Sequence, residues 1–291
     1  MRDILACAPS RIYEDHPGGR FSYTAMVDYF DKMGIPAIDM SFESLSKLDD
    51  SKNAVLYAAA KRAREKNIRL PVCHLSFYMP NPRDGALMEK YSQELKSNID
   101  VASLMEIPMA VIHPIVWYSS EVSYGDWVRA NMAFLAPLVE YARGKGIKLC
   151  IENMPSDRET SDNHLYGSCA LNISALAEKL GAGICFDVGH ANISGYKLSE
   201  QMEILKGKID VMHIHDNMGK GKKDAHLLPF DGTVDWQDVA FGMRRSDFVG
   251  ILDVEVTAWA LPGDSETRSD FGGKVLSRAE RLIYMAKQIK L

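Results

Sequence analysis

The sequence has few cysteines, no excess of basic charge and no long hydrophobic run. Its five cysteines among 291 residues are odd in number and form no Cys-x-x-Cys pair, which indicates buried thiols rather than a disulfide scaffold. Lys and Arg number 34 against 39 Asp and Glu, and the resulting net charge of −5 does not favour a polyanionic partner such as nucleic acid. No apolar stretch reaches the length of a transmembrane helix, and charges interrupt the N-terminal segment where a signal peptide would be apolar. We therefore expect a cytoplasmic protein that does not associate with membranes.

The sequence does contain short apolar runs that alternate with amphipathic stretches, eight times in all. The apolar runs predict strands near residues 3–8, 37–41, 69–77, 109–115, 148–153, 183–188, 210–215 and 250–256. The amphipathic stretches predict helices near residues 22–32, 51–66, 85–105, 124–144, 168–180, 197–206, 236–243 and 270–287. Alternating β and α units favour a parallel sheet, and eight of them favour a closed one. The sequence therefore predicts an α/β protein with a single-domain (β/α)8 TIM barrel over residues 1–291.

Six of the apolar runs end on a side chain of the kind that binds metal ions. In chain order these side chains are His74, His113, Glu152, Asp187, His213 and Glu255. The carboxyl ends of parallel strands lie on one face of a barrel, so residues that are far apart in the sequence converge there. Imidazole and carboxylate groups are typical ligands of a divalent ion. The pattern predicts a metal centre at the carboxyl end of the barrel.

The residue two positions before each of these side chains faces the same side of its strand. These positions hold Val72, Val111, Cys150, Cys185, Val211 and Asp253. Five of the six are small or β-branched, which is typical of a packed barrel interior beneath a polar mouth. Asp253 is the exception. Because a buried carboxylate needs a partner, we expect Asp253 to form an ion pair or to support a metal ligand.

The segments FDVGH, MHIHDN, KDAH and PFDGTVDW, together with IEN and the final EV, resemble the xylose-isomerase-like TIM barrel superfamily over most of the chain. That superfamily contains sugar phosphate isomerases and epimerases as well as family 2 apurinic endonucleases. The resemblance to the epimerases implies that four residues hold one divalent ion and that His190 contacts the substrate. The implied metal ligands are Glu152, Asp187, His213 and Glu255.

The endonuclease pattern implies additional zinc ligands and up to three ions. The residues that match it are His74, His113, His190, Asp224 and His226. Two segments depart from that pattern: a glycine-rich loop is replaced by NMPSDRETSDNH, and an HLND-S segment is replaced by HIHDN-M. An arginine that binds substrate in some epimerases corresponds to Gly219 here. The number of ions therefore stays open between one and three.

The predicted centre suits proton transfer. A divalent ion with two open positions can chelate adjacent oxygens of a hydroxy-ketone, acidify the C–H bond between them and stabilise an enediolate. Glu152 and Glu255 follow the fifth and eighth predicted strands, so we predict that they face each other across the ion as the pair that removes and returns the proton. We expect His215 to point toward the surrounding helices, away from this centre.

Other polar and aromatic residues near the strand ends are candidates for substrate binding. His113, His190 and Asp216 could orient the hydroxyl groups of a substrate. Trp117 and Trp259 follow the fourth and eighth predicted strands, where they could either stack on a sugar ring or pack the loops.

These observations predict a divalent-metal-dependent isomerase or epimerase of a sugar, sugar phosphate or polyol, working by proton transfer through a metal-bound enediolate. The ion would be Mn, Co, Mg or Zn. One alternative is an apurinic-endonuclease-type phosphodiesterase with up to three zinc ions. Another is a metal-dependent dehydratase, because elimination of water from the same enediolate needs little change in the site. A non-catalytic sugar-binding barrel would leave the paired carboxylates without a task. The expected partner is a small carbohydrate, with no nucleic acid, and a homo-oligomer is compatible with the sequence.

Overall fold

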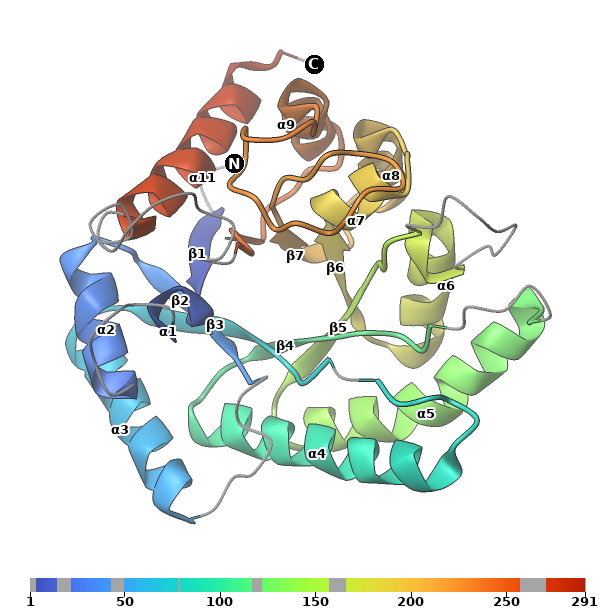
Figure 1. The fold of residues 1–291 in the computed structure, drawn as a ribbon, viewed down its shortest axis with the longest axis horizontal. Coiled ribbons are helices and arrows are strands. Elements are labelled where there is room, and N and C mark those ends of the chain that lie inside the picture. Colours follow the sequence, from blue (N-terminus) through green and yellow to red (C-terminus); the bar gives the residue numbers. More distant parts are fainter. Residues whose placement is uncertain are drawn as a thin grey trace.

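Eight parallel strands close into a barrel in the computed structural model, which describes residues 4–14, 22–42, 50–77, 79–116, 122–156, 166–256 and 271–290 (Figure 1). The strands are β1 Leu5–Pro9, β2 Ala37–Ser41, β3 Arg69–His74, β4 Met109–Ile112, β5 Lys148–Glu152, β6 Gly183–Asp187, β7 Ile209–His213 and β8 Ile251–Asp253. Each strand pairs with its neighbours in the sequence, and β8 pairs with β1 to complete the ring. The predicted (β/α)8 TIM barrel is thereby confirmed.

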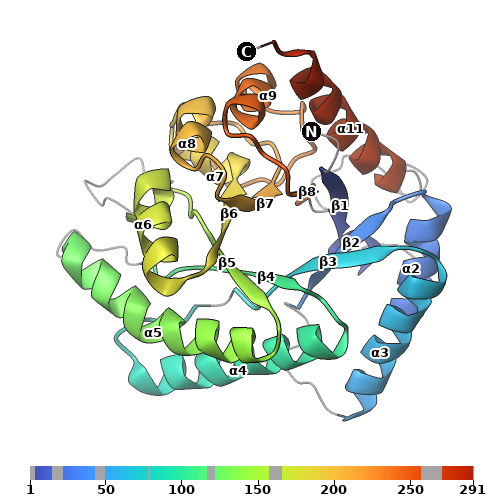
Figure 2. The same ribbon diagram turned by 180° about the vertical axis from the view of Figure 1, so that it is seen from behind.

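Helices surround the barrel on all sides, as both views of the ribbon show (Figures 1 and 2). They are α1 Arg11–Glu14, α2 Tyr23–Lys32, α3 Asp50–Glu65, α4 Gly85–Leu104, α5 Tyr124–Gly144, α6 Ala170–Leu180, α7 Val188–Ile193, α8 Leu198–Ile204, α9 Trp236–Arg245 and α11 Phe271–Gln288, with a short 3-10 turn η1 at Tyr166–Ser168. The sequence analysis did not predict α1 and α7. These helices have four and six residues, which is too short to produce an apolar helical period.

Several helices begin or end at residues whose chemistry favours that position. The carboxylate of Asp84 accepts a hydrogen bond from the backbone N–H of Leu87 at the start of α4, at 3.1 Å. Asp235 does the same for Asp238 at the start of α9, at 3.0 Å. Helix α6 ends at Gly181, whose φ of 62° lies in the left-handed region that glycine tolerates. These residues define where α4 and α9 begin and where α6 ends.

A layer of small apolar side chains fills the interior of the barrel. This apolar layer consists of Cys7, Ala37, Val72, Val111, Cys150, Cys185, Val211 and Ile251, none of which is more than 4% exposed. The five valine and cysteine positions predicted from strand periodicity all belong to it. Because each strand contributes a residue of similar size, the layer forms a closed floor beneath the carboxyl ends of the strands.

The opposite end of the barrel contains a separate cavity of about 680 Å³. The amino-terminal residues of several strands line it, among them Leu5, Arg69, Met109 and Ile209. None of the site residues predicted from the sequence lies there, so this cavity is unconnected with the predicted chemistry. Within the described part of the chain, no helix combines the length and the apolar character needed to cross a lipid bilayer.

Candidate metal centre at the barrel mouth

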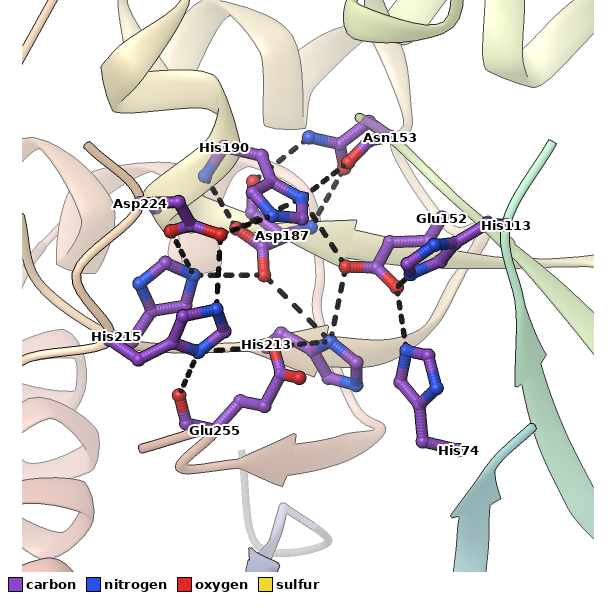
Figure 3. A network of polar contacts seen from close by, with 12 residues as sticks. His74, His113, Glu152, Asn153, Asp187, His190, His213, His215, Asp224 and Glu255 are labelled. Carbon is purple, nitrogen blue, oxygen red and sulfur yellow. Dashed lines mark hydrogen bonds and ion pairs between the residues drawn. The ribbon is translucent and has the colours of Figure 1, made fainter. Parts of the chain in front are cut away.

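The carboxyl ends of the strands bring the predicted metal-binding side chains together (Figure 3). His74, Glu152, Asp187 and His213 are the last residues of β3, β5, β6 and β7. His113 follows β4 directly, and Glu255 lies two residues after β8. Five of these side chains lie immediately above the apolar layer, two residues further along their strands, whereas Glu255 lies four residues beyond Ile251. We call this second set of inward-facing residues the titratable layer.

Glu152 lies at the centre of the titratable layer and is 1% exposed. Its Oε2 lies 3.2 Å from His74 Nε2 and 3.1 Å from His113 Nε2. Its Oε1 lies 3.3 Å from both His213 Nδ1 and His190 Nδ1. Burial alone would raise the pKa of Glu152, but the nearby His213 and His113 outweigh that effect and hold it well below its usual range. Glu152 is therefore an ionised carboxylate whose two oxygens face different pairs of histidines.

Four side chains, one of which is Glu152 itself, form a compact set of metal-type donors, which we call the four-donor set. Ligand atoms of Glu152, Asp187, His213 and Glu255 all lie within 4.8 Å of one another. His213 Nδ1 is 3.2 Å from Glu255 Oε2 and 3.8 Å from Asp187 Oδ2. Asp187 Oδ2 is buried without a well-formed hydrogen bond, and its neighbours are the imidazole nitrogens of His215 and His213 at 3.2 and 3.8 Å, so the carboxylate needs a cation, either a proton on these rings or a metal ion. Three carboxylates and one imidazole therefore fit a divalent ion at this point.

A second donor group lies on the opposite side of Glu152. It consists of Glu152 Oε2 and the imidazoles of His74 and His113, whose ring centroids are 4.9 Å apart and nearly perpendicular. The Nδ1 of His74 lies 2.7 Å from the backbone carbonyl oxygen of Leu75, which orients the ring. His113 is 15% exposed and is thus the most accessible side chain of this group.

A third group extends from Asp187 toward the loop between β7 and α9. Its members are His190, His215, Asp224 and His226. The sequence analysis predicted that His215 would point toward the helices, and this was wrong. His215 is fully buried and its Nε2 lies 3.2 Å from Asp187 Oδ2. Residues two apart along an extended chain share a face. His215 therefore lies on the same inner side as His213, the last residue of β7.

The electrostatic environment differs among the histidines. For His74 and His215, burial lowers the pKa, but Glu152 and Asp187 respectively outweigh it and raise both pKa values to about 9. The pKa of His190 is also raised, because Asp187 and Asp224 overcome the effect of burial. For His113, burial prevails over Glu152 and the pKa is lowered. In the metal-free protein the carboxylates are thus compensated by protons on several imidazoles.

Asn153 holds two of the strand ends in register, a role that the sequence analysis missed. Its side chain accepts a hydrogen bond from Asp187 N–H at 2.7 Å and donates one to the Asp187 carbonyl at 2.9 Å. Asp187 in turn caps α7 by accepting a hydrogen bond from the backbone N–H of His190. In the sequence, the sign of this role is the Asn that directly follows Glu152 in the IEN segment. Asn153 thereby fixes Asp187 relative to Glu152.

The structure gives Asp216 a different role from the predicted substrate contact. Asp216 Oδ1 accepts hydrogen bonds from Asn217 N and Val234 N. Its Oδ2 accepts bonds from Phe230 N and from the indole Nε1 of Trp236. With four donors and no exposure, the carboxylate holds the β7–α9 loop together and has no oxygen left for a substrate hydroxyl. The two predicted aromatic contacts, Trp117 and Trp259, lie outside the described residues.

A hollow of about 500 Å³ opens beside the second donor group. His113 lines it together with apolar side chains from the ends of β3 and β4 and the segments that follow them, including Phe77, Met79, Pro80 and Val116. The ring of Phe77 lies 6.1 Å from that of His113. A cavity of this size accommodates a small ligand, and it gives such a ligand access to the titratable layer.

Comparisons with known proteins agree with the fold. The family model described as xylose isomerase-like TIM barrel matches residues 27–272. The chain is 27% identical over 192 residues to an uncharacterised protein of Methanocaldococcus jannaschii, covering 63% of each chain. It is 27% identical over 166 residues to a probable endonuclease 4 of Methanoculleus marisnigri, covering 51% of this chain and 56% of that one. It is 20% identical over 234 residues to an inosose isomerase of Halalkalibacterium halodurans, covering 79% of this chain and 81% of that one.

The solved structures cover the chain more completely. The IolI protein with a bound zinc atom superposes with a TM-score of 0.76 at 14% identity, covering 99% of this chain and 100% of that one. A D-psicose 3-epimerase in the presence of D-fructose gives a TM-score of 0.72, also at 14% identity, covering 96% and 99%. At these identities the likeness concerns the fold. The match to the Methanocaldococcus protein, in contrast, spans less than two thirds of that relative's length.

Proposed function

We propose that this chain, which belongs to the xylose isomerase-like TIM barrel family, is a divalent-metal-dependent isomerase or epimerase of a sugar, a sugar phosphate or a related polyol. The observation that carries the proposal is the four-donor set at the barrel mouth. Within it Glu152 and Glu255 lie on either side of His213 Nδ1, at 3.3 and 3.2 Å. Two glutamates at one centre can serve both as ligands and as the groups that move a proton.

Metal binding, proton removal and proton return would be carried out by different residues of the four-donor set. A divalent ion held by Glu152, Asp187, His213 and Glu255 would polarise a substrate carbonyl and acidify the neighbouring C–H bond. Glu152 is ionised, as an acceptor of that proton has to be. Glu255, whose Oε2 lies 3.2 Å from the same His213 Nδ1, would return a proton to the opposite face of that carbon. Removal and return of the proton at the same carbon gives epimerisation. Return of the proton to the neighbouring carbon gives isomerisation.

The hollow beside His113 supports a small carbohydrate as the substrate. Its volume of about 500 Å³ is sufficient for a monosaccharide or polyol. His113 lines this space, and its lowered pKa leaves the imidazole neutral near neutral pH. A neutral imidazole can accept a hydrogen bond from a hydroxyl or donate one to it, which suits a polyhydroxylated ligand. The inosose isomerase and psicose 3-epimerase among the similar proteins are consistent with such substrates.

A second candidate function is phosphodiester hydrolysis by an apurinic-endonuclease-type site. The observation that favours it is the number of donors: His74 and His113 adjoin one oxygen of Glu152, and another donor group adjoins Asp187. Centres with two or more ions are typical of phosphodiesterases. The similarity to a probable endonuclease 4 points the same way. We place this function second because proton transfer uses the glutamate pair directly and the net charge of −5 does not favour a polyanionic substrate.

The decisive experiment is a panel of ketoses, aldoses, their phosphates and inososes incubated with metal-reconstituted protein in deuterated water. An enzyme that moves protons introduces deuterium at the carbon next to the carbonyl of the product, detected by NMR. Loss of water from the substrate would instead identify a dehydratase. An abasic-site duplex DNA, assayed in parallel across a range of salt concentrations, tests the second candidate, whose binding would weaken steeply as salt rises.

Glu152→Gln is the control for both assays, because it removes the ionised carboxylate while preserving its size. We expect deuterium incorporation in the native protein and none in this variant. Specific incision of the abasic duplex that Glu152→Gln abolishes, without any turnover of sugars, would overturn the isomerase proposal in favour of the phosphodiesterase.

A further inference from the structure

The two ring nitrogens of His213 face different surroundings. Nδ1 lies 3.3 Å from Glu152 Oε1 and 3.2 Å from Glu255 Oε2, within the four-donor set (Figure 3). Nε2 instead lies 3.8 Å from Asp253 Oδ2. His213 and Asp253 are both fully buried, so bulk water solvates neither of them. The state of this imidazole therefore depends on the side chains around it.

The register of the strands places Asp253 beside His213. Strands β7 and β8 are parallel neighbours, and His213 pairs directly with Asp253. Asp253 lies two residues beyond Ile251 of the apolar layer, so its side chain points into the barrel at the level of the titratable layer. Neighbouring strands lie about 4.8 Å apart, and paired residues that face the same way are therefore adjacent. The contact between Asp253 and His213 thus follows from the backbone of the barrel.

Other histidines at the barrel mouth are oriented by the backbone. His74 Nδ1 lies 2.7 Å from the carbonyl oxygen of Leu75, and His190 Nδ1 lies 2.8 Å from that of Asn153. A carbonyl oxygen only accepts, so in a neutral ring Nδ1 carries the proton and Nε2 presents the lone pair. Within the described residues, neither nitrogen of His213 is hydrogen-bonded to a backbone carbonyl. For His213 the choice between the two nitrogens therefore lies with side chains.

A histidine that binds an ion through Nδ1 must carry its proton on Nε2, because a protonated nitrogen has no lone pair to offer. A carboxylate beside Nε2 favours that form, since its negative charge attracts the N–H group. The separation of 3.8 Å is longer than a hydrogen bond, so Asp253 acts on the ring through its charge. The thiol of Cys185 also adjoins His213, but a thiol is a weak acceptor and competes poorly with a carboxylate.

We infer that Asp253 is a positioning residue for His213: it keeps the imidazole proton on Nε2 and so presents Nδ1 to a divalent ion in the four-donor set. A metal-binding histidine is usually oriented by a group at its second nitrogen, and loss of that group weakens metal binding by about 10- to 100-fold. The inference rests on the proposed function only in that the four-donor set binds a divalent ion. It does not depend on which reaction follows.

Zinc titration of the metal-free protein tests the inference, with a chelator as competitor and with NMR of protein labelled with ¹⁵N-histidine. The resonances of His213 are identified by their absence from His213→Gln, so that only the ion on this ring is counted. In the zinc-loaded native protein we expect His213 to be ligated at Nδ1 and protonated at Nε2. The Nε2–H proton should resonate downfield, because it faces a carboxylate.

Two substitutions separate the charge of Asp253 from its oxygen atoms. Asp253→Asn keeps one oxygen as an acceptor but removes the charge, and zinc at His213 should bind roughly tenfold more weakly. Asp253→Leu removes both, so the loss should approach about a hundredfold. The Nε2–H resonance should move upfield in both variants, and further in Asp253→Leu. Asp253→Asn also covers the case in which Asp253→Leu does not fold.

Asp216→Asn is the matched control, because it makes the same change at another fully buried aspartate. Asp216 holds the β7–α9 loop, so this variant should lose stability but keep the zinc affinity and the His213 spectrum of the native protein. The same result for Asp253→Asn would mean that Asp253 is merely structural, and it would overturn the inference. Zinc-loaded native protein in which His213 is protonated at Nδ1 would overturn it as well.

Failure of the proposed function is recognised separately. Native protein that binds zinc at His213 but turns over no sugar would contradict the reaction and leave the role of Asp253 standing. Sugar turnover by the native protein, together with unchanged zinc affinity in both Asp253 variants, would overturn the positioning role alone. A native protein whose His213 resonances do not respond to zinc would overturn both.

Discussion

Two layers of the same barrel interior, two residues apart along the strands, have opposite physical chemistry. The apolar layer contains aliphatic and thiol side chains, and burial raises the pKa of its cysteines, such as Cys150 and Cys185, so that they stay neutral. The titratable layer contains histidines and carboxylates that are almost as deeply buried, among them Glu152 and His213. Burial is therefore common to both layers, and only the titratable layer concentrates charge.

The two layers therefore contribute differently: the apolar layer stabilises the barrel, and the titratable layer carries the groups for chemistry. The apolar layer gains stability through packing and removal of apolar surface from water. The titratable layer keeps carboxylates and imidazoles out of water, which is costly unless each is compensated. In the metal-free protein this compensation comes from protons and ion pairs around Glu152. Divalent ions would provide it more completely, because they also satisfy Asp187 Oδ2.

The largest effect is expected from neutralising the glutamates of the titratable layer. Glu152→Gln and Glu255→Gln keep the side-chain size but remove the base, so turnover of the cognate sugar should fall by about a thousandfold or more. Metal content must be measured alongside the rate, because both residues are also proposed ligands. Glu140→Gln, at an exposed site, should leave turnover unchanged. Two variants with full metal and near-normal rates would mean that these glutamates have no catalytic role.

A charge placed in the apolar layer should be nearly as damaging, but to folding. Val111 is fully buried, and Val111→Asp would introduce a carboxylate without partners, which we expect to lower the free energy of unfolding by about 4 kcal/mol or more. Val111→Ala, the matched control, should cost only about 2 kcal/mol. Urea unfolding monitored by circular dichroism measures both. Equal losses in the two variants would show that the layer tolerates charge.

The histidines of the titratable layer should make the stability of the metal-free protein depend on pH. Carboxylates raise the pKa of His74 and His215 to about 9, above the ordinary value of 6.5. The resulting stabilisation is fully present below the unfolded pKa and is lost as pH rises through the folded one. One such shift corresponds to on the order of 3 kcal/mol.

Urea unfolding between about pH 6 and pH 10 measures this loss, which metal should reverse because ligation requires neutral imidazoles. The metal-loaded protein should therefore become more stable, relative to the metal-free one, as pH rises toward 9. A flat profile in the metal-free protein would indicate that protons do not compensate the buried carboxylates.

The smallest effect concerns a buried carboxylate that belongs to neither layer. Asp216→Asn places an amide group against four hydrogen-bond donors, so we expect it to lower the free energy of unfolding by about 2 kcal/mol. Substrate affinity should change little. Asp231→Asn, which weakens an exposed ion pair with Arg278, should cost less than about 0.5 kcal/mol. A large rise in KM with unchanged stability would restore Asp216 as a substrate contact.

The positions of the strands and the convergence of their last residues could be predicted because strand geometry is local. Inward-facing residues repeat every two positions, so His74, Glu152 and His213 could be placed on one face from the sequence alone. The same two-residue period continues past the end of β7 and places His215 on the inner side. The hydrogen bonds of Asp216 to its own loop come from contacts that no local pattern encodes.

Tertiary contacts also explain why the sequence did not predict the roles of Asn153 and His215. Asn153 acts through the backbone of Asp187, which lies on the neighbouring strand, and the space for His215 depends on Gly189 in a short helix. Each of these relations joins segments that meet only in the closed barrel. The sequence showed that suitable residue types were present, but their division into separate donor groups depends on the folded barrel.

The scattering of the donors along the chain has a consequence for the order in which the protein matures. His74 is the first donor and Glu255 the last, and β8, which precedes Glu255, must pair with both β7 and β1. A partly folded chain lacking that strand can gather only some of the ligands, and its affinity for an ion would be correspondingly low. We therefore expect the complete donor set to form late in folding. An ion held by the whole donor set would bind only after the ring has closed, and its retention would report that closure is complete.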